Sequence, residues 1–137
     1  MTTFTCTHKA QYYETDQMGI IHHSNYIRWF EEARVYLLEQ IGCPYHRLEE
    51  EGILSPVLEI TCQYHSMVHF GDLVDIRVFV ETFNGIKLSF GYEIRDHETG
   101  EVRTTGTSRH CFMDKEGNLI SLKRSHPAIY ETLQQYK

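Results

Sequence analysis

One stretch of the sequence gathers most of the side chains that could carry out a reaction. Residues 12–26 read YYETDQMGIIHHSNY, in which Asp16 precedes Gly19 and the adjacent imidazoles His22 and His23. A carboxylate in such a stretch can activate water as a general base or attack an acyl carbon as a nucleophile. The residues leave this choice open, and they also allow the plainer interpretation that Asp16 only caps a turn.

A helix is expected to begin directly after these residues. Apolar side chains recur at helical spacing from Tyr26 through Phe30, Ala33 and Leu37 to Ile41. The pattern predicts an amphipathic helix over residues 25–41, about 25 Å long at about 1.5 Å per residue. Its buried face must cover another element of the fold.

Both ends of this helix have suitable residues. Ser24 or Asn25 can supply an N-cap oxygen, and Gly42 followed by Pro44 is typical of a helix end. The N-terminus of a helix presents unpaired backbone N–H groups and a partial positive charge, which can stabilise an oxyanion. The predicted helix start is therefore a candidate oxyanion site beside Asp16.

This combination suits the hydrolysis of a thioester. A thiolate whose conjugate acid has a pKa of about 8.5 leaves with little help from a general acid, whereas an amide needs a proton donor. Gly19 allows the chain to bend sharply between Asp16 and the helix.

The rest of the chain has the period of two that is typical of strands. Phe4–Tyr13 is predicted as a first strand, and after the helix the apolar residues alternate over 58–64, 74–80, 86–94 and about 102–113. Asn84-Gly85 predicts a type I′ hairpin between the second and third of these runs. A short helix is expected after Ser125.

These elements predict an α+β fold, in which one antiparallel sheet packs against one long helix. One helix cannot cover a large sheet alone, so the remaining sheet surface is expected to meet another subunit. The chain has 137 residues, which allows a single domain over 1–137 and no second one.

Composition excludes several functional classes. The formal net charge of -6 argues against binding of nucleic acid, which needs a basic surface. The sequence lacks an apolar run long enough for a signal peptide or a membrane span, so a cytoplasmic protein is expected. No CxxC, HExxH or HxH pattern occurs among the four cysteines and nine histidines, so no metal and no cofactor is predicted.

Residues 12–26 also resemble a family motif. They are similar to the pattern Tyr-x-acidic-Thr-Asp-x-x-Gly-hydrophobic-hydrophobic-x-His-x-Asn-Tyr of the 4-hydroxybenzoyl-CoA thioesterase-like (YbgC-like) branch of the hotdog superfamily. The likeness continues into the stretch WFEEAR at residues 29–34. It implies a hotdog fold, an antiparallel sheet wrapped around a central helix, and acyl-CoA thioesterase activity with the CoA thioester as substrate.

The resemblance also implies roles for particular residues. It places the catalytic carboxylate at Asp16, with Tyr12 and His23 as further catalytic residues and a backbone N–H near His23 in the oxyanion hole. Gly19, His22 and Asn25 are then expected to position these groups. Glu14 stands where many members have Asp, and His22 stands where a Tyr is common, so substrate preference can differ.

Coenzyme A carries phosphates, which call for cations at the mouth of the site. Lys87, Ser89 and Arg109 are predicted to bind CoA, and Arg95 and Arg103 are further candidates. The resemblance implies a homodimer with sites between subunits, often paired into a homotetramer.

Two other functions stay open. One is hydrolysis of acyl groups on acyl carrier protein; the other is non-catalytic binding of acyl thioesters, because a fold does not fix a function. A dehydratase is disfavoured, since the chain has no His-Phe-Pro-Gly-His-type segment.

Overall fold

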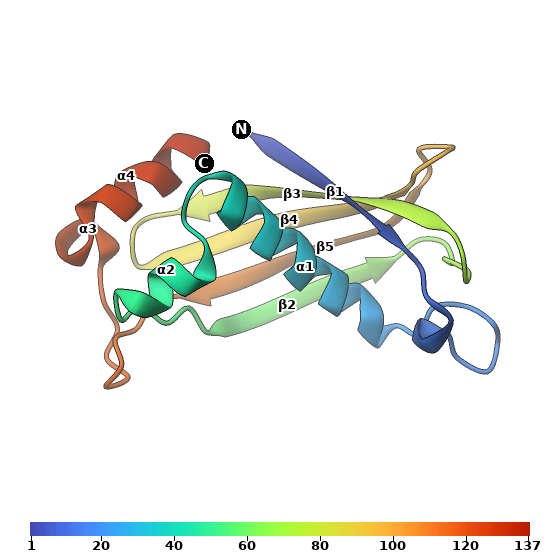
Figure 1. Cartoon of the computed structure of the whole chain (residues 1–137), viewed down its shortest axis with the longest axis horizontal. Helices are drawn as coiled ribbons and strands as arrows, with labels where there is room; N and C mark the ends of the chain where they lie inside the picture. The colour runs from blue at the N-terminus through green and yellow to red at the C-terminus, as the bar shows by residue number, and fades with distance from the viewer.

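The computed structural model describes residues 1–137 and contains one five-stranded sheet curved around a long helix (Figure 1). All neighbouring strands are antiparallel, in the order β1-β3-β4-β5-β2. The strands are β1 (Thr3–Lys9), β2 (Val57–Tyr64), β3 (Leu73–Phe83), β4 (Lys87–Asp96) and β5 (Val102–Cys111). The predicted α+β class and the order of one strand, one long helix and four strands are confirmed.

The long helix α1 spans Ser24–Gln40, within one residue of the prediction at each end. Its buried face includes Trp29, Phe30, Ala33 and Leu37, which are at most 1% exposed. Gly42 follows the helix with a φ of +82°, as expected for a left-handed residue after a helix end.

The predicted N-cap is wrong. His23 occupies the N-cap position, and no side chain there forms a capping hydrogen bond. Ser24 and Asn25 already lie inside the helix. The Ser24 N–H donates to Nδ1 of His22 at 3.2 Å. The His22 imidazole is therefore the side-chain acceptor at the helix start, in place of the predicted Ser24 or Asn25 oxygen.

The first strand is shorter than predicted, because it ends at Lys9 and Tyr12–Glu14 forms the 3-10 helix η1. The carboxylate of Glu14 is buried and accepts the N–H of Gln11, which closes this turn. Alternating side chains do not reveal such a turn, since it depends on burying a charged group.

Three short helices complete the chain: α2 (Tyr45–Glu50), α3 (Leu122–Ser125) and α4 (Pro127–Tyr136). Of these, α4 is the helix expected after Ser125, whereas the sequence pattern predicts neither α2 nor α3. Helices α3 and α4 lie at the end of the sheet opposite the start of α1 (Figure 1). None of the helices has both the length and the apolar character needed to cross a membrane.

The hairpin between β3 and β4 is antiparallel as predicted, but its turn is not type I′. Gly85 has a φ of +90°, while Asn84 does not have a positive φ. The side-chain oxygen of Asn84 instead accepts the N–H groups of Ile86 and Lys87, at 2.9 and 2.8 Å. These two hydrogen bonds stabilise a turn in which only Gly85 is left-handed.

Strand β2 forms one edge of the sheet and pairs only with β5. Apolar side chains near its two ends are exposed within one chain: Leu58 is 50% exposed and Tyr64 is 49% exposed. An edge strand with exposed apolar side chains is a common site of association between chains.

A buried chain of hydrogen bonds fixes α1 on the sheet. Arg34 donates through Nη1 to the hydroxyl of Tyr92 and through Nε to that of Tyr45, each at 3.1 Å. The Tyr92 hydroxyl forms a hydrogen bond with the Ser108 hydroxyl at 2.6 Å. The Ser108 hydroxyl forms another with Nε2 of His110 at 2.8 Å. Burial, and then the charge of Arg34, lower the pKa of His110 to about 4.

This pKa predicts a loss of stability in mild acid. Below pH 6.5 the unfolded chain binds a proton at His110, while the folded chain does not until about pH 4. Between pH 7.5 and 4.5 this difference lowers the free energy of unfolding by about 2–3 kcal/mol. Urea titrations at pH 7.5 and 4.5 measure this fall in the free energy of unfolding. In His110→Gln the fall should be smaller than in wild type by that amount. Equal falls in wild type and His110→Gln would contradict the assignment.

Candidate active site

Asp16 lies in a tight loop between η1 and α1. Its backbone N–H donates to Ile20 O at 2.8 Å, and the Gly19 N–H donates back to Asp16 O at 3.1 Å. Gly19 has a φ of +78°, which favours glycine at this position. The carboxylate oxygen Oδ1 accepts the Met18 N–H at 2.8 Å, whereas Oδ2 has no hydrogen-bond partner in the chain. Asp16 thus keeps one oxygen for a water molecule or a substrate.

The start of α1 presents a free donor beside this loop. The backbone N–H of His23 takes part in none of the hydrogen bonds around the helix start, whereas those of His22 and Asn25 are both used. The hydroxyl of Tyr64, at the end of β2, donates to His23 O at 3.0 Å. The His22 and His23 rings stack with centroids 4.1 Å apart. This positive helix end can hold an anionic oxygen.

Asp16 and His23 face the same pocket, which has a volume of about 360 Å³. Its lining contains one carboxylate, two imidazoles, two phenols and mainly apolar groups, with no Lys or Arg. These residues are Asp16, Met18, Ile20, Ile21, His23, Tyr26, Tyr64, His65, Ser66 and Met67. A mostly apolar pocket with a few polar groups is typical of a small-molecule site.

The other residues predicted for catalysis or positioning lie around this pocket and do not line it. Tyr12 is 76% exposed, and its ring packs edge-on against Phe70 at 5.6 Å. Asn25 is buried, and its Nδ2 donates to the carbonyls of Glu14 and His22, at 2.9 and 3.3 Å. Asn25 therefore ties the loop to the helix.

The residues predicted to bind CoA are not brought to this pocket within one chain. Lys87 starts β4, while the Asp16 loop lies near the opposite end of the sheet (Figure 1). Strand β4 alone is about 30 Å long at about 3.3 Å per residue. The Ser89 hydroxyl bonds Thr82 at 2.6 Å. Arg109 is exposed and lies 3.7 Å from Glu59. Their part in binding stays a prediction.

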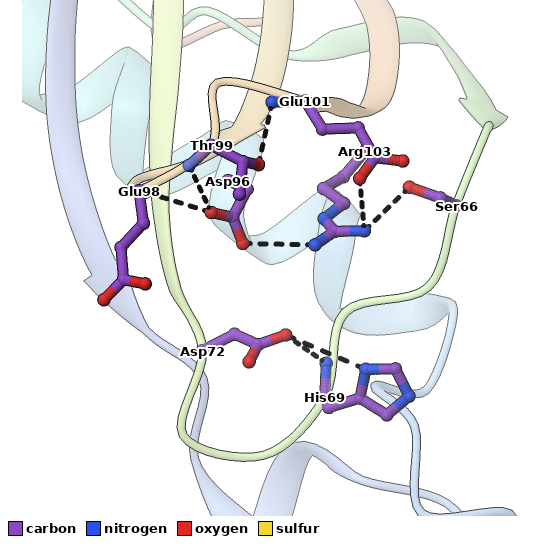
Figure 2. Close-up of polar contacts among 8 residues, drawn as sticks. All are labelled: Ser66, His69, Asp72, Asp96, Glu98, Thr99, Glu101 and Arg103. Carbon is purple, nitrogen blue, oxygen red and sulfur yellow. Dashed lines mark hydrogen bonds and ion pairs between the residues drawn. The ribbon is translucent and has the colours of Figure 1, made fainter.

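Arg103, another predicted cation, supports the pocket wall (Figure 2). Its guanidinium pairs with Asp96 at 3.1 Å and Glu101 at 3.2 Å, and donates to the Ser66 hydroxyl at 3.1 Å. Its carbonyl accepts the N–H groups of His65 and Ser66. The backbone N–H of Thr99, and then the guanidinium of Arg103, lower the pKa of Asp96 to about 2. Arg95 likewise pairs with a neighbour, Glu93.

Sequence reasoning missed the part of the wall formed by residues 65–67. Tyr64 fits the alternation of β2, and the aromatic side chains of the strands are compatible with an apolar pocket or with core packing, so the sequence leaves its role open. Its contact with His23 spans 41 positions of the chain. No local pattern reports such a contact, because it depends on where β2 ends relative to α1.

An antiparallel sheet wrapped around one long helix is the fold of the hotdog thioesterases, and Asp16 and His23 line one pocket beside the start of that helix. The family model of the thioesterase-like superfamily matches residues 11–133, and the chain belongs to this family.

Similar proteins agree with this family. YneP of Bacillus subtilis, provisionally named an acyl-CoA thioesterase, is 35% identical over 94% of each chain. The acyl-CoA thioester hydrolase YbgC of Escherichia coli O157:H7 is 25% identical over 71% of this chain and 72% of its own. The structure of a DHNA-CoA thioesterase from Staphylococcus aureus matches with a TM-score of 0.93 and 32% identity, covering 98% of this chain and 91% of the other. The predicted fold, family and enzyme class are confirmed.

Proposed function

We propose that this chain hydrolyses an acyl-CoA thioester to a carboxylic acid and CoA, with Asp16 as its catalytic carboxylate. The observation that carries the proposal is the pocket that Asp16 and His23 both line, together with a His23 N–H that has no backbone partner. The relatives named above, whose names refer to CoA thioesters, support CoA as the carrier.

In the general-base form of the reaction, Oδ2 of Asp16 takes a proton from water, and the resulting hydroxide adds to the thioester carbonyl. The carbonyl oxygen becomes an oxyanion held by the His23 N–H at the positive end of α1. The C–S bond then breaks, and the CoA thiolate takes the proton back from Asp16. In the nucleophilic form, Asp16 attacks the carbonyl, the thiolate leaves, and water hydrolyses the mixed anhydride.

The neighbouring residues orient these groups. The His23 ring contacts the bound thioester from the pocket wall, and Tyr64 holds the His23 carbonyl in place. Gly19 and Asn25 shape and fasten the loop, while His22 supports the helix start through Ser24. Tyr12, which is exposed and packs against Phe70, acts on substrate that extends beyond the pocket.

We further propose that the working site is formed between two copies of the chain. Two β2 edges that pair antiparallel would place the Val57 end of one strand beside the Tyr64 end of the other. Arg109, which pairs with β2 at Glu59, would then approach the second copy's pocket. Leu58 and Tyr64 would lose their exposure, and a tetramer would be a pair of such dimers.

The dimer proposal predicts that Leu58→Asp gives monomers with little activity. Light scattering should show a dimer or tetramer for wild type and a smaller particle for the variant, since a charge at a buried edge opposes association. Leu119→Asp is the matched control, because Leu119 is also exposed, at 59%, but lies outside β2. A wild-type monomer with full turnover would rule out the shared site.

The activity itself is tested with purified protein and short, medium, long and aromatic acyl-CoAs, with release of free CoA as the readout. Turnover of at least one substrate is expected. Much faster cleavage of the same acyl group on acyl carrier protein would identify acyl carrier protein, and not CoA, as the carrier. Tight acyl-CoA binding without release of CoA would identify a binding protein and overturn the proposal.

A further inference from the structure

The carboxylate of Glu14 is the most deeply buried acidic group beside the site. Glu14 is 5% exposed, and its two oxygens accept hydrogen bonds from three segments. Oε2 accepts from Trp29 Nε1 on α1 at 2.7 Å, and Oε1 accepts from the Gln11 N–H at 2.8 Å. Oε1 also meets Nε2 of His8 on β1 at 2.9 Å. Burial alone would raise the pKa of Glu14, but these hydrogen bonds outweigh it and lower the pKa.

The backbone of Glu14 holds the other end of the same loop. Its carbonyl oxygen accepts the His22 N–H at 2.8 Å and Nδ2 of Asn25 at 2.9 Å. One residue therefore fixes both where the loop leaves η1 and where it enters α1. Asp16 follows Glu14 by two positions, and His23 directly follows His22.

We infer that Glu14 is a positioning residue, which sets the separation between the Asp16 carboxylate and the His23 N–H. The inference rests on the function proposed above. A displacement of about 1 Å between reacting groups can lower a rate about 100-fold. The anchor requires a carboxylate, because the N–H groups of Trp29 and Gln11 both need an acceptor. In Glu14→Gln the amide NH₂ must face one of them.

The test measures kcat and KM for Glu14→Gln in the wild-type and Asp16→Asn backgrounds. In wild type, kcat should fall about 10- to 100-fold while KM changes less than about 3-fold. In the Asp16→Asn background the further loss should be less than about 3-fold, because the two residues act as a unit. Glu14→Asp, which keeps the carboxylate, should recover part of the loss.

Glu32→Gln is the matched control, since Glu32 is half exposed and contacts only the other nitrogen of His8, at 3.2 Å. It should leave kcat within about 2-fold. Trp29 is the single tryptophan, so one indole N–H resonance reports the anchor by NMR. That resonance should move upfield in Glu14→Gln and stay in place in Glu32→Gln.

The outcomes separate this inference from the proposed function. Full kcat in a folded Glu14→Gln, or equal losses in both backgrounds, overturns the positioning role. Full turnover in Asp16→Asn overturns the proposed function instead. If Glu14→Gln does not fold, Trp29→Phe removes one donor and keeps most of the ring; its kcat should fall by several-fold in wild type, and an unchanged kcat overturns the inference.

Discussion

Replacing Asp16 with Asn is expected to lower kcat about 10²- to 10⁴-fold while KM changes less than about 3-fold. Asn is neutral and can neither take a proton from water nor attack a carbonyl. Its side-chain oxygen can still accept the Met18 N–H, which Asp16 accepts at 2.8 Å, so the loop should keep its shape. Steady-state release of CoA from a good acyl-CoA substrate measures both constants.

Asp114→Asn provides the matched control. Asp114 also accepts backbone N–H groups within its own turn, from Glu116 at 3.0 Å and Asn118 at 2.9 Å. The same chemical change in this remote turn should leave kcat within about 2-fold of wild type. Equal losses in the two variants would show that Asp16 acts through stability and not through the reaction.

The two roles of Asp16 are separable by single turnover with excess enzyme in ¹⁸O-water. A general base directs labelled water to the acyl carbon, so the first acid released contains label. If Asp16 is the nucleophile and water attacks the carboxyl carbon of Asp16, that acid is unlabelled and the label remains in the protein. Mass spectrometry of the acid and of the peptide with Asp16 distinguishes these outcomes.

Phe30→Ala should lower the free energy of unfolding by about 3–5 kcal/mol. Phe30 is fully buried, and its ring stacks on Tyr92 with centroids 4.4 Å apart. It packs where β5 has Gly106, at which an added Cβ would lie 2.5 Å from the ring. The space opened by alanine lies between helix and sheet, where the backbone cannot readily close in.

Urea unfolding of wild type and Phe30→Ala gives this difference directly. Phe70→Ala removes the same side chain from a residue that is 58% exposed, and it should cost less than about 1 kcal/mol. A small effect of Phe30→Ala would mean that the contact between α1 and β5 contributes little to stability.

The long helix and most strands could be predicted because their patterns are local. Apolar spacing places α1 within one residue of its observed ends, and Gly42 marks its termination. Two errors occur where an unexpected side chain accepts backbone N–H groups. His22 takes the place of the predicted N-cap, and Asn84 stabilises a turn that the Asn-Gly pair predicts as type I′.

The sequence by itself determined that Asp16, Gly19 and a helix start stand next to one another, since these are neighbours along the chain. It could not determine that Tyr64 closes the pocket, that Arg103 supports its wall, or that Lys87 lies far from it. Strand register and the end of β2 decide these distances, and they arise from packing between segments tens of residues apart. Asp16 keeps one oxygen free because the other accepts the N–H of Met18, two residues further on, and tertiary contacts of Glu14 anchor the loop in which this occurs.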